Sequence, residues 1–201
     1  MDRGWYGLQD NTMSISFLTF KENYKSISGR LTEFQAQGIK TILDAWEKYD
    51  SLTDIRQLAY ILATVKHETA NTFLPIAEYG YGRGGSYGKL INGKAYYGRG
   101  YVQLTWLSNY QVMTERLRAK GFDVDLVNNP DDVMIPNIAI QIMFIGMHEG
   151  LFTGKKLSQY FNEVTEDPIS ARKIINGKDK AKMIAGYYYE FKNALQVSRN
   201  A

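Results

Sequence analysis

The sequence predicts a mainly α (α+β) fold, and three observations lead to this expectation. Apolar residues recur at helical spacing over most of the chain, as in amphipathic helices. One segment, residues 80–101, breaks this period and is rich in glycine and tyrosine. The length of 201 residues, with 44% apolar and 22% charged residues, suits one domain with a sizeable core. We therefore expect packed helices and one irregular region with a small β-hairpin.

Two amphipathic helices are predicted in the first third of the chain. The first covers about residues 31–48, and its apolar face consists of Leu31, Phe34, Ile39, Ile42, Leu43 and Trp46. The second covers about residues 54–69 and follows a capping sequence at residues 51–54. Its apolar face consists of Ile55, Leu58, Ala59, Leu62, Val65 and Thr69.

Residues 80–101 are predicted to form a long irregular loop. They contain 8 of the 18 glycines and five tyrosines. Glycine permits positive φ and close approach of backbones, and long irregular loops in compact domains are often functional. Within this segment, residues 89–97 are expected to form a small hairpin, with a type I′ turn at Asn92-Gly93.

The second half of the chain is expected to contain five further helices. They cover about residues 103–120, 136–150, 155–162, 168–175 and 179–195, with Asp179 as the cap of the last one. A turn is expected at Asn128-Asn129-Pro130. The helix from Pro136 is the most apolar and is expected to lie in the core, since its apolar run is too short for a membrane span.

Composition narrows the range of functions. The absence of cysteine excludes disulfides, thiolate metal sites and a cysteine nucleophile. The net charge of +3 is concentrated in residues 155–201, which carry a net +4, and this is weaker than the basic stripe of a nucleic-acid-binding protein. The start of the chain has no signal-peptide pattern. No cofactor, nucleic-acid partner or stable membrane insertion is expected.

Two carboxylates are candidates for acid–base chemistry. Glu68 follows Val65 by three residues and therefore lies on or beside the apolar face of its helix. Burial and the negative end of the helix dipole both favour a protonated acid there. Glu78 lies ten residues further on, at the start of the glycine- and tyrosine-rich loop. Such a pair is typical of glycoside hydrolysis, although a surface role for Glu68 is the simpler alternative.

Other chemistries fit less well. His67-Glu68 begins a zinc-protease pattern, but position 71, where the second histidine should stand, is Asn. The glycine cluster lacks the Gly-Lys-Ser/Thr of a phosphate-binding loop. No Gly-x-Ser-x-Gly elbow predicts a serine nucleophile. No metal site is expected.

Four sequence motifs stand out. The longest is Tyr96-Tyr97-Gly98-Arg99-Gly100-Tyr101-Val102-Gln103-Leu104-Thr105-Trp106, followed by Asn109-Tyr110. The others are His67-Glu68-Thr69, Asn128-Asn129-Pro130 and Ile174-Ile175-Asn176-Gly177. In type and order, these motifs resemble those of family 19 glycoside hydrolases, which comprise the plant-type chitinases and their bacterial and phage endolysin relatives. Together they cover about residues 54–195. The resemblance implies a lysozyme-like domain of two helical lobes around a cleft, here residues 21–201, after a partly ordered N-terminal extension of residues 1–20.

The resemblance also implies roles for individual residues. Glu68 matches the general acid, Glu78 the general base, and Thr105 the residue that positions the attacking water. The matched sugar-binding positions are His67, Tyr96, Gln103, Asn109, Tyr110 and Asn176. Simpler structural roles stay open: a hydrogen-bonded partner for His67, core packing for Tyr110 and Trp106, a helix cap for Thr105 or Asn176, and a loop-holding ion pair for Arg99.

The chain also departs from the plant enzymes. They place the second carboxylate further downstream and carry disulfides, so the compact bacterial and phage branch is the better match. Their arginine in the last helix has no clear counterpart, because Lys182-Met183 stands near its position.

The expected function is that of an endolysin, which cleaves the β-1,4-linked backbone of peptidoglycan by an inverting mechanism. We expect a monomer made in the bacterial cytoplasm that reaches the wall after a holin-type partner permeabilises the membrane. The alternatives are a chitinase and a non-catalytic glycan-binding relative.

Overall fold

A computed structural model describes residues 14–49 and 51–199, so most of the expected N-terminal extension lies outside the described residues. The α-helices are α1 (Phe17–Ser28), α2 (Glu33–Trp46), α3 (Ile55–Glu68), α4 (Leu107–Ala119), α5 (Pro136–Glu149) and α6 (Ala181–Ser198). Two short antiparallel pairs are formed by β1 (Ile76–Ala77) with β2 (Arg99–Gly100) and by β3 (Phe161–Asn162) with β4 (Thr165–Glu166). Four 3₁₀ helices are η1 (Ser86–Gly88), η2 (Pro130–Met134), η3 (Leu157–Gln159) and η4 (Ser170–Ile174). The expected mainly α class is confirmed.

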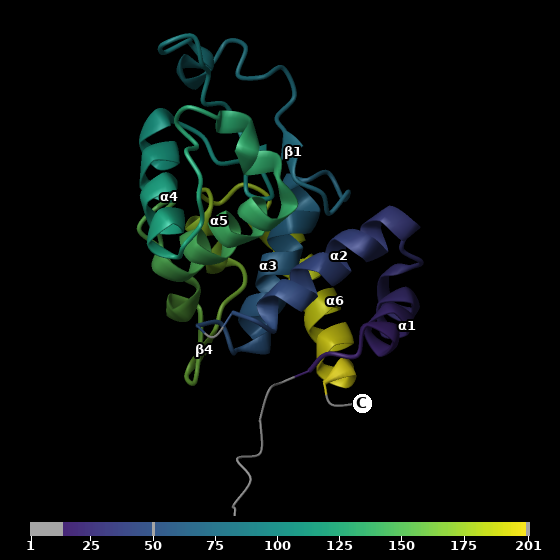
Figure 1. Cartoon of the computed structure of the whole chain (residues 1–201). Coiled ribbons are helices and arrows are strands. Elements are labelled where there is room, and N and C mark those ends of the chain that lie inside the picture. The colour runs from purple at the N-terminus through teal and green to yellow at the C-terminus, as the bar shows by residue number, and fades with distance from the viewer. Residues whose placement is uncertain (1–13, 50, 200–201) are drawn as a thin grey trace, which may run out of the picture.

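Helix α3 lies at the centre of the molecule and packs along α6 (Figure 1). Every residue from Gln57 to Val65 is buried. A helix that is buried on all sides must be apolar nearly all round, and this sequence meets that condition. Because its final residue is Glu68, the central helix carries the first candidate carboxylate out of the core at its C-terminal end.

Helix α1 was not predicted from the sequence. Its N-cap is Ser16, whose hydroxyl accepts a hydrogen bond from the amide of Thr19. The Phe20 ring of this helix is fully buried and stacks on Phe191 of α6, with ring centroids 6.4 Å apart. The packed body therefore includes residues 15–20, which the sequence analysis placed in the N-terminal extension.

The glycine- and tyrosine-rich loop is closed at its base by β1 and β2. Ile76 pairs with Gly100 and Ala77 with Arg99, so the chain between them forms one excursion that rises above α3 in Figure 1. The predicted turn at Asn92-Gly93 is confirmed, since both residues have positive φ, 52° and 77°. The hairpin around that turn is reduced to a single bridge between Ile91 and Lys94.

Two positions in the loop show why it requires glycine. A Cβ added at Gly88 would lie 2.0 Å from the carbonyl oxygen of Gly82. Gly82 itself has φ of +77° and faces the backbone of Gly88. The two backbones therefore touch where the loop folds on itself, and no side chain fits between them.

Four predicted elements differ from the observed ones. Helix α4 begins at Leu107 rather than 103, because Gln103 and Trp106 both have positive φ. The expected helices at 155–162 and 168–175 are the short η3 and η4. Asp179 does not cap α6: the cap is Lys180, and the helix continues to Ser198.

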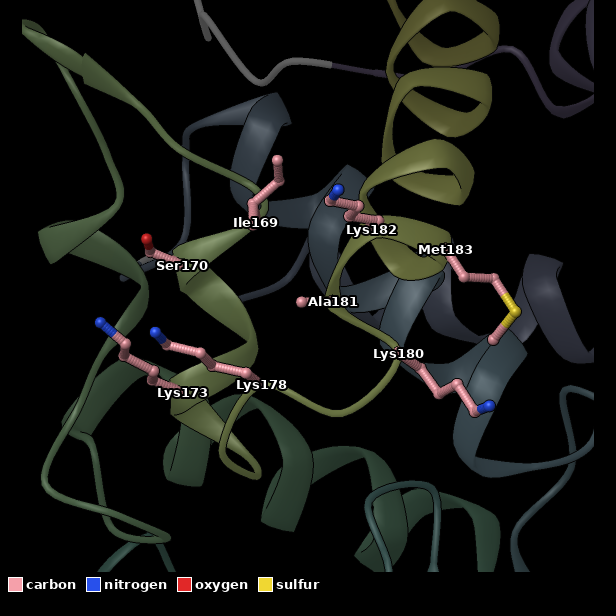
Figure 2. A pocket seen from close by; sticks show the side chains of 8 residues that line it. All are labelled: Ile169, Ser170, Lys173, Lys178, Lys180, Ala181, Lys182 and Met183. Carbon is pink, nitrogen blue, oxygen red and sulfur yellow. The ribbon is translucent and has the colours of Figure 1, made fainter.

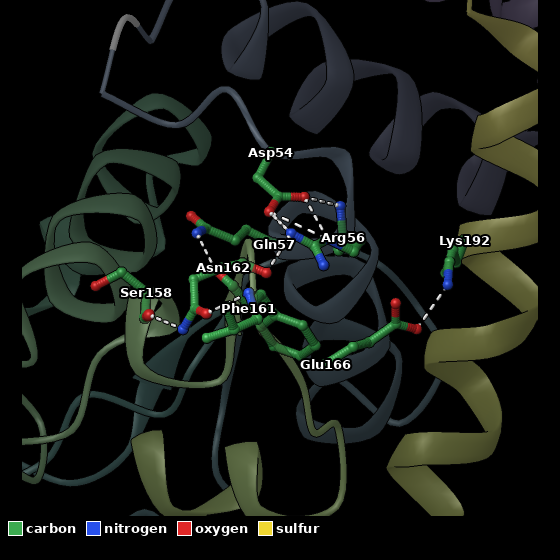
Figure 3. A network of polar contacts seen from close by, with 9 residues as sticks. Asp54, Arg56, Gln57, Ser158, Phe161, Asn162, Glu166 and Lys192 are labelled. Atoms are coloured by element: carbon green, nitrogen blue, oxygen red, sulfur yellow. Dashed lines mark hydrogen bonds and ion pairs between the residues drawn. The ribbon is translucent and has the colours of Figure 1, made fainter.

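A polar network holds the start of α3 against the β3–β4 pair (Figure 3). Arg56 pairs with Asp54 and donates to the carbonyl of Asn162 at 2.9 Å. Gln57 donates to the carbonyl of Phe161 at 3.0 Å. These contacts hold the N-terminal end of α3, whereas Glu68 lies at its C-terminal end.

None of the described helices is long and apolar enough to cross a membrane.

Candidate active site

Glu68 forms an ion pair with Arg172 at the C-terminal end of α3. Arg172 Nη1 lies 2.5 Å from Glu68 Oε1, and the two side chains are only 4% and 14% exposed. Arg172 Nε also donates to the carbonyl of Asp179 at 3.1 Å, which fixes the plane of the guanidinium. Arg172 is the charged partner of Glu68 that the sequence analysis missed. The arginine implied by the resemblance was expected in the last helix, where Lys182-Met183 stands, whereas Arg172 lies in η4.

The position of Arg172 is set by η4. Asp167 Oδ1 accepts a hydrogen bond from the amide of Ser170 at 2.9 Å, and hydrogen bonds from Ser170 lower the pKa of the Asp167 carboxyl. Thr153 donates its hydroxyl to the carbonyl of Lys173 at 2.6 Å. These contacts hold η4 at both ends, so Arg172 has little freedom to leave Glu68.

Glu78 follows β1 directly and is held by the strand pair. Its amide donates to the carbonyl of Gly98 at 2.8 Å, just beyond the last residue pair of β1 and β2. Its Oε1 atom is buried and has no hydrogen-bond partner among the described residues. An unpaired buried carboxylate oxygen is costly and calls for an explanation, such as a catalytic role. It can accept a hydrogen bond from water or substrate.

Gly98 brings Glu78 and Gln103 together. A Cβ at Gly98 would lie 2.9 Å from Gln103 Oε1 and 3.2 Å from Glu78 Oε2. Gln103 in turn donates from Nε2 to the carbonyls of Ile76 and Gly100, each at 3.2 Å. Its amide side chain therefore braces the strand pair that carries Glu78. The absence of a side chain at Gly98 makes this arrangement possible.

Thr105 and Asn109 continue from Gln103 toward α4. Thr105 donates its hydroxyl to the carbonyl of Gln103 at 2.7 Å, which leaves the oxygen lone pairs free to accept. Asn109 Nδ2 donates to the carbonyl of Thr105 at 2.7 Å. Thr105 is not the cap of α4, because Trp106 occupies that position. The structure thus groups Glu78, Gln103, Thr105 and Asn109.

The aromatic residues of the motif separate into buried and exposed ones. Tyr96 is 3% exposed and donates its hydroxyl to the carbonyl of Val127, and Tyr110 is fully buried. These two rings support the loop from inside and present no surface to a sugar. Trp106 is 48% exposed and packs edge-on against Tyr87. It is the more accessible surface for a sugar ring.

Arg99 is buried beneath this loop. It donates from Nε to Asp131 at 2.8 Å and from Nη1 to the hydroxyl of Tyr110 at 3.0 Å. Its guanidinium carbon lies 3.5 Å from the ring centroid of Tyr97. The loop-holding ion pair predicted for Arg99 is confirmed.

The two remaining predicted residues lie on the Glu68 side. His67 is half-buried in the last turn of α3. Asn176 is exposed, and its amide donates to the carbonyl of Arg172 at 2.9 Å. The Asn176 side chain accepts a hydrogen bond from the amide of Gly177 at 2.8 Å, so only its backbone is tied to the Glu68–Arg172 pair. Glu78 with its neighbours forms a second group. In Figure 1, β1, which Glu78 follows, lies beside the end of α3.

Comparison with known proteins supports the fold. The sequence matches no family model and no curated protein. Among solved structures, the chain has the lysozyme-like, mainly helical fold of family 19 chitinases. Chitinase C from Streptomyces griseus HUT6037 aligns with a TM-score of 0.61 and 22% identity, over 98% of this chain and 80% of that one. A bacterial family 19 chitinase aligns with a TM-score of 0.53 and 23% identity, over 90% of this chain and 94% of that one.

Proposed function

We propose that this chain is a glycoside hydrolase that cleaves β-1,4-linked amino-sugar polymers by inversion. The observation that carries the proposal is the pair of carboxylates, Glu68 on the central helix and Glu78 at the base of the loop, in the fold of family 19 chitinases. The names of the structural neighbours point to chitin-like glycans. The contrast between the two carboxylates supports a division of roles between them.

In the proposed reaction, Glu68, which pairs with Arg172 as a carboxylate, takes up a proton from water and then acts as the general acid. It gives its proton to the glycosidic oxygen as the bond from that oxygen to the anomeric carbon breaks. Glu78 is the general base, because its Oε1 has no donor among the described residues and can take a proton from water. The water oxygen then bonds to the anomeric carbon from the opposite face. Thr105, whose proton is engaged by Gln103, can accept a hydrogen bond from that water.

Peptidoglycan is the substrate that we propose, with chitin as the alternative. Both contain β-1,4-linked N-acetylglucosamine, but only peptidoglycan carries carboxylates. The net charge of +4 on residues 155–201 favours the anionic polymer. In this proposal the chain is an endolysin, which is made in the bacterial cytoplasm and reaches the wall after a holin-type partner permeabilises the membrane. The neighbours that are called chitinases favour chitin.

The test is mass spectrometry of the products formed from purified peptidoglycan and from chitin oligomers. Cleavage of the peptidoglycan backbone supports the proposal, and cleavage of chitin alone would assign a chitinase. Cleavage of neither, with retained binding, would indicate a non-catalytic glycan-binding protein. Proton NMR of the newly formed reducing end tests inversion, because the first product must have the anomeric configuration opposite to that of the substrate.

A further inference from the structure

A basic hollow is formed by η4 and by the segment that leads into α6. It has a volume of about 520 Å³ and is lined by Ile169, Ser170, Lys173, Lys178 and residues 180–183. We refer to it as the lysine hollow, because four of these residues are Lys173, Lys178, Lys180 and Lys182. Figure 2 shows Lys173 and Lys178 at one rim and Lys180 with Met183 at the other, with Ala181 between them.

The four lysines are available to a ligand. All four are exposed, and in the described part of the chain none forms an ion pair within 4 Å. Two acidic residues are near in sequence. Asp167 interacts at longer range with Lys173 and accepts a hydrogen bond from Ser170, and the exposed Asp179 stands between Lys178 and Lys180 in sequence. Four lysines against these two carboxylates leave the hollow with a net positive charge.

The hollow also has an apolar component. Ile169 is 50% exposed and Met183 is 40% exposed, and both contribute to its lining. A simple inorganic anion would leave these side chains unused. A ligand with several carboxylates joined by short aliphatic groups would use both the lysines and the apolar surface. Short acidic peptides that contain alanine have this chemistry.

The lysine hollow is coupled in space to the proposed acid through η4. Ser170 and Lys173 of η4 line the hollow. Arg172 belongs to the same short helix and contacts Glu68. A ligand in the hollow is therefore one short helix away from the proposed acid. This separation fits a group attached to the glycan backbone, rather than the sugar that is cleaved.

We propose that the lysine hollow binds the carboxylate-bearing peptide side chains of peptidoglycan and so selects this polymer over neutral chitin. The inference rests on the proposed function and names the substrate class of the same site. The lysines recognise the carboxylates, and Ile169 with Met183 contacts the methyl groups between them. The uncapped N-terminus of α6, which begins beside Lys180, adds favourable potential for anions.

The experiment is co-sedimentation with insoluble peptidoglycan that has been freed of protein and of phosphate-bearing polymers. The binding form is Glu68→Gln, which keeps the polymer intact during the measurement. Lys173→Gln/Lys178→Gln in this form should weaken binding roughly 3- to 10-fold, as expected for the loss of two solvent-exposed charge contacts. Lys48→Gln/Lys120→Gln is the matched control, since these two exposed lysines lie at the ends of other helices, α2 and α4, and the change in net charge is the same.

A second substrate separates charge recognition from general binding. Peptidoglycan whose carboxylates are converted to methylamides should bind the Glu68→Gln form equally with and without the two lysine changes, at the weaker level. Equal binding of both proteins to untreated peptidoglycan would overturn the inference, and so would an equal loss of binding on both substrates. Failure of the proposed function is distinguishable, because it appears as absence of glycan cleavage by the chain with Glu68 intact.

Discussion

Arg172 Nη1 lies 2.5 Å from Glu68 Oε1, although the two residues are 104 positions apart in sequence. Both side chains are largely buried, and Arg172 is fixed by a second hydrogen bond to the carbonyl of Asp179. The ion pair therefore ties the end of the central helix to η4. Arg172 therefore contributes both to the stability of the fold and to the orientation of the proposed acid.

Arg172→Met should lower the free energy of unfolding by about 3 kcal/mol, because it leaves the Glu68 carboxylate buried without its cation. Urea unfolding at pH 7 measures this loss. Arg172→Lys, which keeps the charge but not the forked donor geometry, should lose less. In a Glu68→Gln background the same Arg172→Met change should cost clearly less. An equal cost in both backgrounds would show that Arg172 acts through packing and not through the pair.

Glu68→Gln should leave a folded protein and reduce glycan cleavage by roughly 10²- to 10⁴-fold, the range of a general acid. Circular dichroism checks the fold, and release of reducing ends from peptidoglycan or chitin oligomers checks the rate. Glu163→Gln is the control, because Glu163 is exposed in the turn between β3 and β4. Retained activity in Glu68→Gln would remove this residue from the role of acid.

Gly98→Ala should impair catalysis more than stability. The added Cβ would lie 2.9 Å from Gln103 Oε1 and 3.2 Å from Glu78 Oε2, so at least one of these two side chains must shift. A displaced base is expected to lower kcat by roughly 10- to 100-fold. Gly177→Ala is the matched control, because its Cβ meets nothing within 4 Å. Unchanged kinetics in Gly98→Ala would show that the position of Glu78 is not critical.

Two other glycines should respond to alanine in opposite ways. Gly88→Ala places a Cβ 2.0 Å from the carbonyl oxygen of Gly82, and should destabilise the loop and lower the melting temperature. Gly186→Ala is in the exposed part of α6 with open space around it, and should stabilise the protein by about 0.5–1 kcal/mol through helix propensity. Thermal unfolding of both variants tests this contrast, and a shift of the same sign in both would contradict it.

The sequence predicted the glycine- and tyrosine-rich loop but not the reason for its glycines. Composition could indicate mobility or close approach to a sugar. The structure adds a local reason, since Gly82 and Gly88 are in backbone contact and several others have positive φ. Such contacts depend on how the loop folds on itself, and no periodic pattern in the sequence records them.

The candidate site shows the same division between local and long-range information. The apolar face of the second predicted helix placed Glu68 correctly at the edge of the core, because helical spacing is local. Arg172 was missed, because its contact with Glu68 depends on the packing of η4 against the end of α3. The motif also could not separate Tyr110, which is fully buried, from Trp106, which is half-exposed, since both fit one aromatic pattern.

The stability of the fold should decline at alkaline pH, in part through Tyr101. Burial raises the pKa of Tyr101 to about 12, from an ordinary value of 10. As pH rises, the unfolded chain therefore loses the phenol proton of Tyr101 before the folded chain does. The contribution of Tyr101 to the free energy of unfolding is complete below pH 10 and is lost as pH rises toward 12. At pH 11 the loss is about 1 kcal/mol for this one residue. Tyr110 should act in the same direction, because burial also raises its pKa to about 12.

Tyr101→Phe isolates this contribution. The variant keeps the buried ring but cannot ionise, so its free energy of unfolding should fall by about 1 kcal/mol less than that of the unmodified chain between pH 8 and pH 11. Urea unfolding at these two pH values measures the difference. Tyr79→Phe is the control, because Tyr79 is 96% exposed and its removal should leave the pH dependence unchanged. Identical losses in Tyr101→Phe and the unmodified chain would mean that the Tyr101 phenolate gains access to water without unfolding.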